Sequence, residues 1–236
     1  MESIKSIVTY PRILKKRIDE ILWSEVWHDT INEIDWLKGI SLSPGRFAVG
    51  YNYLYVVTRI LNEFRPLRIL DVGLGISSTL ISRYFEELDN PSGEHIIVEH
   101  DEEWKEFYCK TRKLSDQSTI VMKSTTDERI GMESCLGYID FSTNLQNKRF
   151  NLISVDGPGC GPKYSRRDIL KLLPNVLDEQ WIIIFDDYNN RGVKQTVNET
   201  KRILANKGYA FCCGKYSGLS DVYVMASEAN RYYCSL

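Results

Sequence analysis

The sequence has no long apolar run and no excess of charge of either sign. No stretch reaches the roughly 18 consecutive apolar residues that a membrane-spanning helix needs. Thirty basic residues stand against 32 acidic ones, for a formal net charge of −2, which argues against a dominant nucleic-acid-binding or polybasic membrane-binding surface. The first five residues also lack the apolar segment of a secretory signal. We therefore expect neither nucleic acid nor a membrane span among the interactions of this chain.

Paired cysteine spacings are absent as well. The six cysteines include no CxxC motif, and Cys212 and Cys213 are adjacent. This usage argues against a zinc site or a disulfide framework and indicates reduced thiols in a cytoplasmic protein. A length of 236 residues is enough for one α/β domain with additions.

The most informative stretch is a short buried strand followed by a glycine turn. Residues 68–72 are apolar enough for a strand that is covered on both faces. Gly73 and Gly75 then break the pattern, and Ser77 and Ser78 offer hydroxyl groups to the start of a helix. Strand, glycine turn and helix together are typical of the nucleotide-binding corner of an open α/β sheet.

The same corner excludes two common phosphate sites. A dinucleotide fingerprint has a third glycine where this chain has Ser78, and no Gly-Lys-Ser/Thr of a P-loop follows the turn. A glycine pair after a strand can also be an ordinary turn, so the motif alone leaves that alternative open.

Strands alternate with helices along most of the chain. We expect strands at residues 68–72, 95–100, 119–122, 150–156, 181–185, 209–213 and 221–226, and helices at 10–38, 53–64, 103–114, 165–176 and 193–206, one after the glycine turn, and one within 124–147. The alternation predicts a doubly wound, mostly parallel seven-stranded sheet of the α/β class. The last two strands must form an antiparallel hairpin, because no crossover helix fits between them. Residues 1–43 are expected to be an N-terminal helical extension to a domain spanning 44–236.

The N-terminal extension carries three tryptophans, Trp23, Trp27 and Trp36. Large apolar side chains on an amphipathic helix are used for helix packing, for a homodimer surface or, less often, to cover a ligand pocket. A homodimer is therefore one expectation for this chain.

Acidic residues stand at the carboxyl ends of four of the predicted strands: Asp71, Glu99, Asp156 and the pair Asp186 and Asp187. Ligands of open α/β sheets bind outside these strand ends. Glu99 ends the strand next to the glycine corner, where a carboxylate can accept hydrogen bonds from both hydroxyls of a ribose. Four strand-end carboxylates at one edge indicate a binding or catalytic site rather than isolated helix caps.

In order and placement, these segments resemble the motifs of class I S-adenosylmethionine-dependent methyltransferases, over roughly residues 44–226. Residues 71–75 (DVGLG) resemble the first motif of that family, with Ser77 where many members have a third glycine. Residues 98–104 resemble its ribose-binding motif. Residues 155–157 (VDG) and 185–188 (FDDY) resemble the branch that methylates small molecules and sugars. The resemblance implies a Rossmann-like methyltransferase fold with an antiparallel last strand.

The resemblance also implies the cofactor, S-adenosylmethionine, whose cationic sulfonium suits an edge lined with carboxylates. The residues expected to contact it are Asp71, Gly73, Gly75, Ser77, Ser78, Glu99, His100 and Asp156. The adenine contact is expected near residues 124–126.

Methyl transfer is an in-line displacement that depends on how the acceptor is positioned. By resemblance to metal-dependent O-methyltransferases of the catechol type, Asp156, Asp186 and Asp187 are candidate ligands of a divalent ion such as Mg²⁺. That type has Asn where this chain has Asp187, which leaves the third ligand open. In a metal-free version, the general base is Asp156 or one Asp of the pair Asp186 and Asp187.

Lys163 is a further catalytic candidate, because it follows a glycine- and proline-rich loop and can contact an anionic or polyhydroxyl acceptor. The neighbouring Arg166 and Arg167 have the same potential, or simply begin a helix and remain solvated.

The leading interpretation is an O-methyltransferase that acts on a small-molecule or sugar-containing (glycan) acceptor. The alternatives are an N-methyltransferase without a metal and a non-catalytic relative that binds the cofactor or a partner protein.

Overall fold

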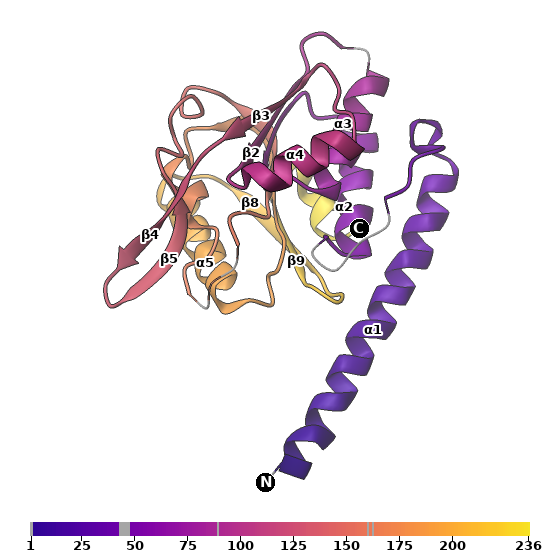
Figure 1. Ribbon diagram of the computed structural model, residues 1–236, viewed down its shortest axis with the longest axis vertical. Helices are drawn as coiled ribbons and strands as arrows, with labels where there is room; N and C mark the ends of the chain where they lie inside the picture. Colours follow the sequence, from indigo (N-terminus) through magenta and orange to yellow (C-terminus); the bar gives the residue numbers. More distant parts are fainter. Residues whose placement is uncertain (1, 43–47, 89, 160, 162) are drawn as a thin grey trace.

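A seven-stranded sheet forms the centre of the computed structural model, which describes residues 2–42, 48–88, 90–159, 161 and 163–236 (Figure 1). Its strand order is β3-β2-β1-β6-β7-β9-β8. The strands are β1 (Arg68–Val72), β2 (Glu94–Glu99), β3 (Ser118–Met122), β6 (Phe150–Val155), β7 (Leu177–Phe185), β8 (Phe211–Tyr216) and β9 (Val222–Ser227). All neighbouring pairs are parallel except those of β9, which runs antiparallel to both β7 and β8. The predicted α/β sheet with an antiparallel last strand is confirmed.

The register of the parallel strands brings their carboxyl ends level. Val72 of β1 pairs with Val98 of β2 and with Val155 of β6, and Val155 pairs with Phe185 of β7. The residues that follow these positions therefore meet at one edge of the sheet, as the sequence predicts for the strand-end carboxylates.

Helices cover both faces of the sheet. The elements are α1 (Glu2–Asn32), α2 (Tyr51–Arg59), α3 (Ile76–Leu88), α4 (Glu102–Thr111) and α5 (Arg191–Asn206), with short turns η1 (Asp35–Leu37), η2 (Ile60–Phe64), η3 (Arg167–Lys171) and η4 (Glu228–Cys234). The end of α1 packs with α2 and α3 over one face, where Ile69, Leu152 and Ile182 point. The helix α5 covers the other face through Val193 and Val197. The central strands β1 and β6 are buried along most of their length, and their sequences are mostly apolar.

Two expected helices are absent from the described residues. Residues 124–147 contain instead a hairpin, β4 (Thr125–Ile130) and β5 (Glu133–Tyr138), which forms a separate two-stranded sheet projecting from the body (Figure 1). Gly131 at its tip has φ +63°, a conformation that glycine adopts without strain. The expected helix at 165–176 shrinks to the short turn η3, because Pro174 cannot continue a helix and β7 already begins at Leu177.

The N-terminal helix extends over Glu2–Asn32 rather than 10–38, so Trp23 and Trp27 lie on it and Trp36 lies in the turn η1. Trp27 and Trp36 are buried. The half-buried Trp23 packs on Tyr55 and donates its indole N–H to the carbonyl oxygen of Ser217 at 2.7 Å. The chain uses these indoles in its own packing, and the homodimer surface stays a prediction.

Two further expectations concern the chain as a whole. The proposed boundary between residues 43 and 44 lies outside the described residues. The cysteines in the described part of the chain are free, as predicted. None of the helices described has the length and apolar character to cross a membrane.

Candidate functional site

The glycine turn after β1 brings two strand ends into close contact. Gly73 has φ +112°, and a Cβ atom built on it would lie 3.2 Å from the carbonyl carbon of Asp156 and 3.3 Å from the nitrogen of Gly157. Both the backbone conformation and the space therefore require glycine at this position. Gly75 has open space around it, so its role in the turn is not steric.

Asp71 lies beneath this turn and is fully buried. Its Oδ2 accepts hydrogen bonds from the hydroxyls of Ser78 at 2.6 Å and Ser77 at 3.4 Å, and it lies 3.8 Å from Nε2 of the buried His95. Ser78 replaces the third glycine of a dinucleotide site with a side chain that holds the carboxylate. The other oxygen, Oδ1, has no hydrogen-bond partner among the described residues.

Glu99 ends β2 beside the glycine turn and is held by backbone N–H groups. Its Oε2 accepts a hydrogen bond from the N–H of Leu74 at 2.9 Å, and its Oε1 accepts from those of His100 at 2.6 Å and Asp101 at 2.9 Å. The imidazole of His100 also lies 2.9 Å from Oε1. These contacts fix the carboxylate at the edge of the sheet, where the sequence places a ribose-binding residue.

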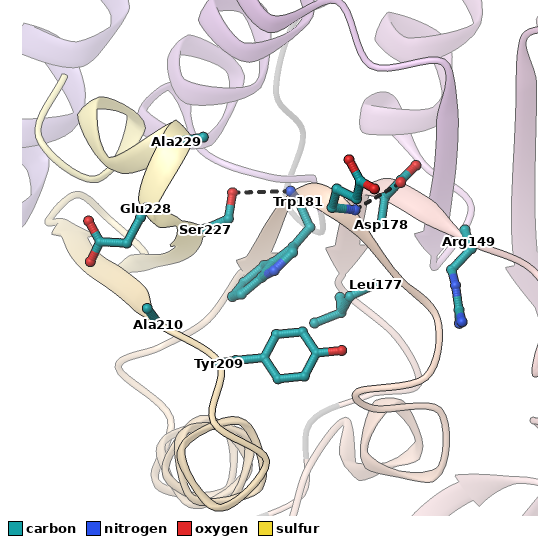
Figure 2. Close-up of a pocket in the computed structure, with 10 residues that line it drawn as sticks. Arg149, Leu177, Asp178, Trp181, Tyr209, Ala210, Ser227, Glu228 and Ala229 are labelled. Carbon is teal, nitrogen blue, oxygen red and sulfur yellow. Dashed lines mark hydrogen bonds between the residues drawn. The ribbon is translucent and has the colours of Figure 1, made fainter.

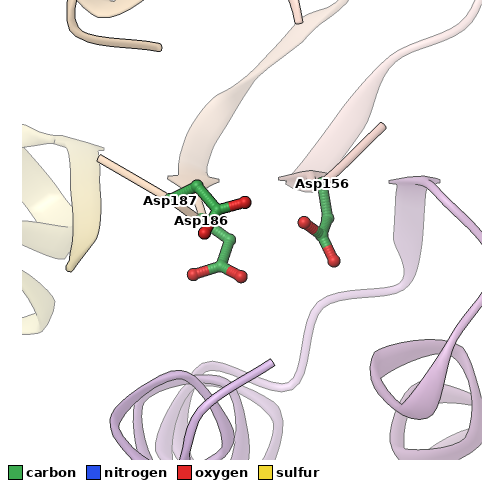
Figure 3. A group of neighbouring side chains, drawn as sticks. All are labelled: Asp156, Asp186 and Asp187. Carbon is green, nitrogen blue, oxygen red and sulfur yellow. The ribbon is translucent and has the colours of Figure 1, made fainter. Parts of the chain in front are cut away.

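Three aspartates converge at the ends of β6 and β7 (Figure 3). One carboxylate oxygen from each of Asp156, Asp186 and Asp187 lies within 4.8 Å of the other two. The carboxyl of Asp186 is buried, with its Oδ1 lacking a hydrogen-bond partner among the described residues. The sequence-based expectation that these three carboxylates meet is thus confirmed by the geometry.

A guanidinium lies among these carboxylates. Nη2 of Arg166 is 2.8 Å from Oδ1 of Asp156 and 2.5 Å from Oδ2 of Asp187, and Nη1 donates to the backbone oxygen of Asp186 at 2.6 Å. The side chain is 4 % exposed, so it is not the solvated helix start that the sequence allowed. Its backbone has φ 59°, a left-handed conformation that no local pattern in the sequence indicates.

The arrangement shifts the pKa values of the buried carboxyls upward. Burial raises the pKa of Asp186 to about 6, with Arg166 opposing the shift and Asp187 adding to it. Burial also raises the pKa of Asp156 well above its usual range, against the opposing effect of Arg166, although 24 % of that side chain remains exposed. Asp186 can therefore exchange a proton near neutral pH.

Lys163 lies at the border of this site, in an ion pair with Glu133 at the start of β5. The pair links the loop after β6 to the β4–β5 hairpin, and the Lys163 side chain is 31 % exposed. Its catalytic role stays a prediction, as does the adenine contact near residues 124–126.

Tyr138 is a residue of this edge that the sequence did not suggest. Its buried hydroxyl has no hydrogen-bond partner among the described residues and lies 2.8 Å from where a Cβ on Gly157 would be. Its ring meets that of His100 edge to face at 6.0 Å. Because residues 124–147 read as a polar segment with a helix, nothing in the sequence indicated a tyrosine at the end of a strand here.

One cavity lies away from this edge of the sheet. A cavity of about 560 Å³ opens beside Leu177, Trp181 and Tyr209 (Figure 2). Its lining residue Trp181 stands on β7 five positions before Asp186, so about 17 Å of strand separates it from the aspartates. None of the strand-end carboxylates lines it, and we do not assign it to the site.

The described residues fit S-adenosylmethionine and fit a metal poorly. Three buried polar atoms, Oδ1 of Asp71, Oδ1 of Asp186 and the hydroxyl of Tyr138, lack hydrogen-bond partners within the described chain; a bound molecule with cationic and donor groups would satisfy them. The three aspartates have the chemistry of a hard-cation site, but Arg166 already binds two of them. An ion does not fit beside this guanidinium.

Comparisons with known proteins agree with the fold. No protein-family model and no curated protein sequence matches the chain. Among solved structures, a candidate O-methyltransferase from Klebsiella pneumoniae superimposes with a TM-score of 0.60 at 14 % identity, over 88 % of this chain and 98 % of that one. An O-methyltransferase from Bacillus cereus in complex with S-adenosylhomocysteine gives a TM-score of 0.50 at 14 % identity, over 90 % and 91 %. TomG, an O-methyltransferase of Streptomyces achromogenes in complex with S-adenosylmethionine, gives 0.50 at 14 % identity, over 75 % and 78 %. The chain has the Rossmann-like fold of class I methyltransferases.

Proposed function

We propose that this protein is an S-adenosylmethionine-dependent methyltransferase that methylates a hydroxyl oxygen of a small-molecule or sugar-containing acceptor. The observation that carries the proposal is the convergence of Glu99, the Gly73 turn and the aspartates of β6 and β7 at one edge of a sheet with this fold. The fold alone does not establish an activity, so the proposal rests on these side chains.

The cofactor would supply an electrophilic methyl group on a cationic sulfonium. Glu99, fixed by three backbone N–H groups, would accept hydrogen bonds from the ribose hydroxyls. The unpartnered Oδ1 of Asp71 would receive the amino group of the cofactor, directly or through water. Gly75, which has open space around it, would allow the molecule to approach the backbone of the turn.

The acceptor must lose a proton as it is methylated. Asp186 is suited to take that proton, because its carboxyl is buried at the strand edge with one oxygen unpartnered among the described residues, and its pKa of about 6 makes it a usable base at neutral pH. Asp156 is the second candidate base. Water excluded from this edge would strengthen the interaction of either carboxylate with the acceptor hydroxyl.

Experiment can distinguish three other versions. Magnesium at Asp156, Asp186 and Asp187 would require Arg166 to leave its present contacts. An N-methyltransferase would use the same carboxylates to bind a protonated amine, and a cofactor-binding relative without turnover would show binding alone.

Mass spectrometry of acceptor mixtures tests the proposed reaction. Purified protein with S-adenosylmethionine is incubated with catechols, monosaccharides, oligosaccharides and primary amines, and products that gain a methyl group are identified. We expect oxygen-methylated products with the wild-type protein and at least 100-fold less with Asp186→Asn. Methylation confined to amines would replace this proposal with the N-methyltransferase.

We also propose that two copies associate through α1, by side chains other than the predicted tryptophans. The helix extends away from the body (Figure 1) and has large exposed apolar residues at spacings of three and four: Leu14, Ile18, Ile21, Leu22 and Val26. Such a stripe on a helix indicates a contact surface.

The charges of α1 favour a second copy in the antiparallel direction. Along α1 the basic residues Lys15, Lys16 and Arg17 come first, and the acidic residues Asp19, Glu20, Glu25 and Asp29 follow. Two antiparallel copies would place the basic half of each helix against the acidic half of the other, as a twofold interface requires.

Light scattering tests this association. We expect a dimer for the wild type, a monomer for Ile18→Asp/Leu22→Asp, and a dimer for the control Ile139→Asp, whose site is also exposed but outside α1. Lys15→Glu should weaken the dimer, and adding Glu25→Lys should restore it. A wild type that is still monomeric at about 100 µM, roughly a hundredfold above a Kd of about 1 µM, would contradict the pairing.

A further inference from the structure

Arg166 contacts every member of the aspartate cluster at once. Its Nη2 is bound by the carboxylates of Asp156 and Asp187, which come from different strands, and its Nη1 by the backbone oxygen of Asp186. Nη1 also lies 3.4 Å from the backbone oxygen of Val155, the last residue of β6. One guanidinium thus connects the ends of β6 and β7.

The cluster needs a cation. Carboxylates whose oxygens lie within 4.8 Å of one another repel strongly unless a proton or a positive charge compensates them. A guanidinium is always charged in proteins, and its planar set of donors suits several oxygens at fixed angles. With only 4 % of its side chain exposed, Arg166 has been placed inside the cluster rather than beside it.

The oxygens that Arg166 binds are those that a metal would need. Oδ1 of Asp156 is 2.8 Å from the guanidinium and Oδ2 of Asp187 is 2.5 Å from it. The other oxygen of Asp187 accepts a hydrogen bond from the hydroxyl of Ser220 at 2.8 Å. A divalent ion bound to the same carboxylates would face the positive charge of Arg166 at close range, so the two cations exclude each other.

We propose that Arg166 takes the place of a divalent cation in this site, fixing the carboxylates of Asp156 and Asp187 so that methyl transfer proceeds without a metal. The effect on methyl transfer rests on the proposed methyltransferase function, whereas the replacement of a divalent ion by Arg166 does not. Arg166 acts here as a positioning residue: it holds two carboxylates and leaves the carboxyl of Asp186 to meet the acceptor.

The direct test is metal binding, which does not depend on activity. Mn²⁺ is titrated into the full-length protein and followed by electron paramagnetic resonance of the free ion. We expect the wild type to bind Mn²⁺ at least tenfold more weakly than Arg166→Met, in which a neutral side chain of similar length leaves three carboxylates uncompensated. Arg166→Met/Asp187→Asn is the matched control, and it should lose the gained affinity.

The second readout is turnover with and without chelator. Wild-type methylation should be unchanged in excess EDTA, whereas Arg166→Met should lose at least tenfold in activity and recover part of it with added Mg²⁺. If Arg166 had only a structural role, added Mg²⁺ would not restore activity to Arg166→Met. Arg166→Lys keeps the charge without the planar donors and should fold, bind no Mn²⁺ and lose activity that Mg²⁺ does not restore.

Two results would overturn the inference. One is tight Mn²⁺ binding by the wild type that Asp187→Asn abolishes, because it would show that the ion displaces the guanidinium. This titration needs no arginine variant, so it decides the question even if Arg166→Met does not fold. The other is a folded Arg166→Met that gains no Mn²⁺ affinity. Failure of the methyltransferase proposal would look different: the Mn²⁺ results would stand while no acceptor is methylated.

Discussion

Replacing Asp186 with Asn should make the protein more stable and less active. The substitution removes a buried charge while keeping the shape of the side chain. Asp186 is 5 % exposed, and burial raises its pKa from 3.8 to about 6. The charged groups that act on it are Arg166, which opposes the shift, and Asp187 and Glu20, which add to it.

The size of the effect follows from the shift. A raised pKa means that the folded protein holds the proton more tightly than the unfolded chain, so stability is lost as the pH rises from the unfolded-state pKa to the folded-state pKa. A shift of roughly two units corresponds to about 3 kcal/mol in the free energy of unfolding. The penalty is absent below about pH 4, grows between pH 4 and 6, and is complete above pH 6.

Urea unfolding at several pH values measures this difference. We expect Asp186→Asn to exceed the wild type by about 3 kcal/mol at pH 7.5 and to equal it near pH 3.5. Methyl transfer at pH 7.5 should fall at least 100-fold. Wild-type activity should rise as the pH passes 6 and then level off.

A second aspartate of the same strand provides the control. The pKa of Asp178 is lowered, chiefly because an N–H donor and the guanidinium of Arg68 outweigh its partial burial. Asp178→Asn should therefore destabilise the protein at neutral pH, the opposite of Asp186→Asn. The reasoning is refuted if Asp186→Asn loses stability at pH 7.5, or if its difference from the wild type is the same at every pH.

Three further substitutions test the rest of the site. Gly73→Ala forces a positive φ on a residue with a Cβ and places that atom 3.2 Å from the backbone of Asp156. The free energy of unfolding, measured by urea titration, should therefore drop by about 1–3 kcal/mol. Binding of S-adenosylhomocysteine should also be lost. Ser78→Ala removes the 2.6 Å hydrogen bond to the buried Asp71 and should cost about 1–3 kcal/mol in the same assay. Lys163→Ala breaks a half-exposed ion pair and should lower the free energy of unfolding by at most about 1 kcal/mol. If this lysine contacts the acceptor, steady-state kinetics should show a higher KM for the acceptor, with cofactor binding unchanged.

The sheet and its carboxylate edge could be predicted from the sequence because their signals are local. A buried parallel strand is a short apolar run, and the residue that follows it, as with Glu99 after β2 or Asp186 after β7, lies at the binding edge whatever the rest of the chain does. The register of β1, β2, β6 and β7 then brings these residues level. The placement of the strand-end carboxylates at one edge of the sheet is therefore readable from one sequence.

The role of Arg166 could not be predicted, because it depends on the fold around it. In the sequence it is one of two adjacent arginines in a polar loop, a pattern typical of a solvated helix start. Its partners stand 10 and 21 positions away, and its left-handed backbone directs the side chain between them. The β4–β5 hairpin was missed for a related reason: its strands are polar and pair with each other rather than with the main sheet.

The measurement that tests the central claim most directly is calorimetric titration of S-adenosylhomocysteine into the wild type, Glu99→Ala and Glu102→Ala. Glu99 is held at the strand end by the N–H groups of Leu74, His100 and Asp101, whereas Glu102 is an exposed residue at the start of α4. We expect one saturable site per chain in the wild type, unchanged affinity in Glu102→Ala, and at least tenfold weaker binding in a folded Glu99→Ala. No binding by the wild type, or equal binding by all three proteins, would contradict the assignment of this edge to the cofactor.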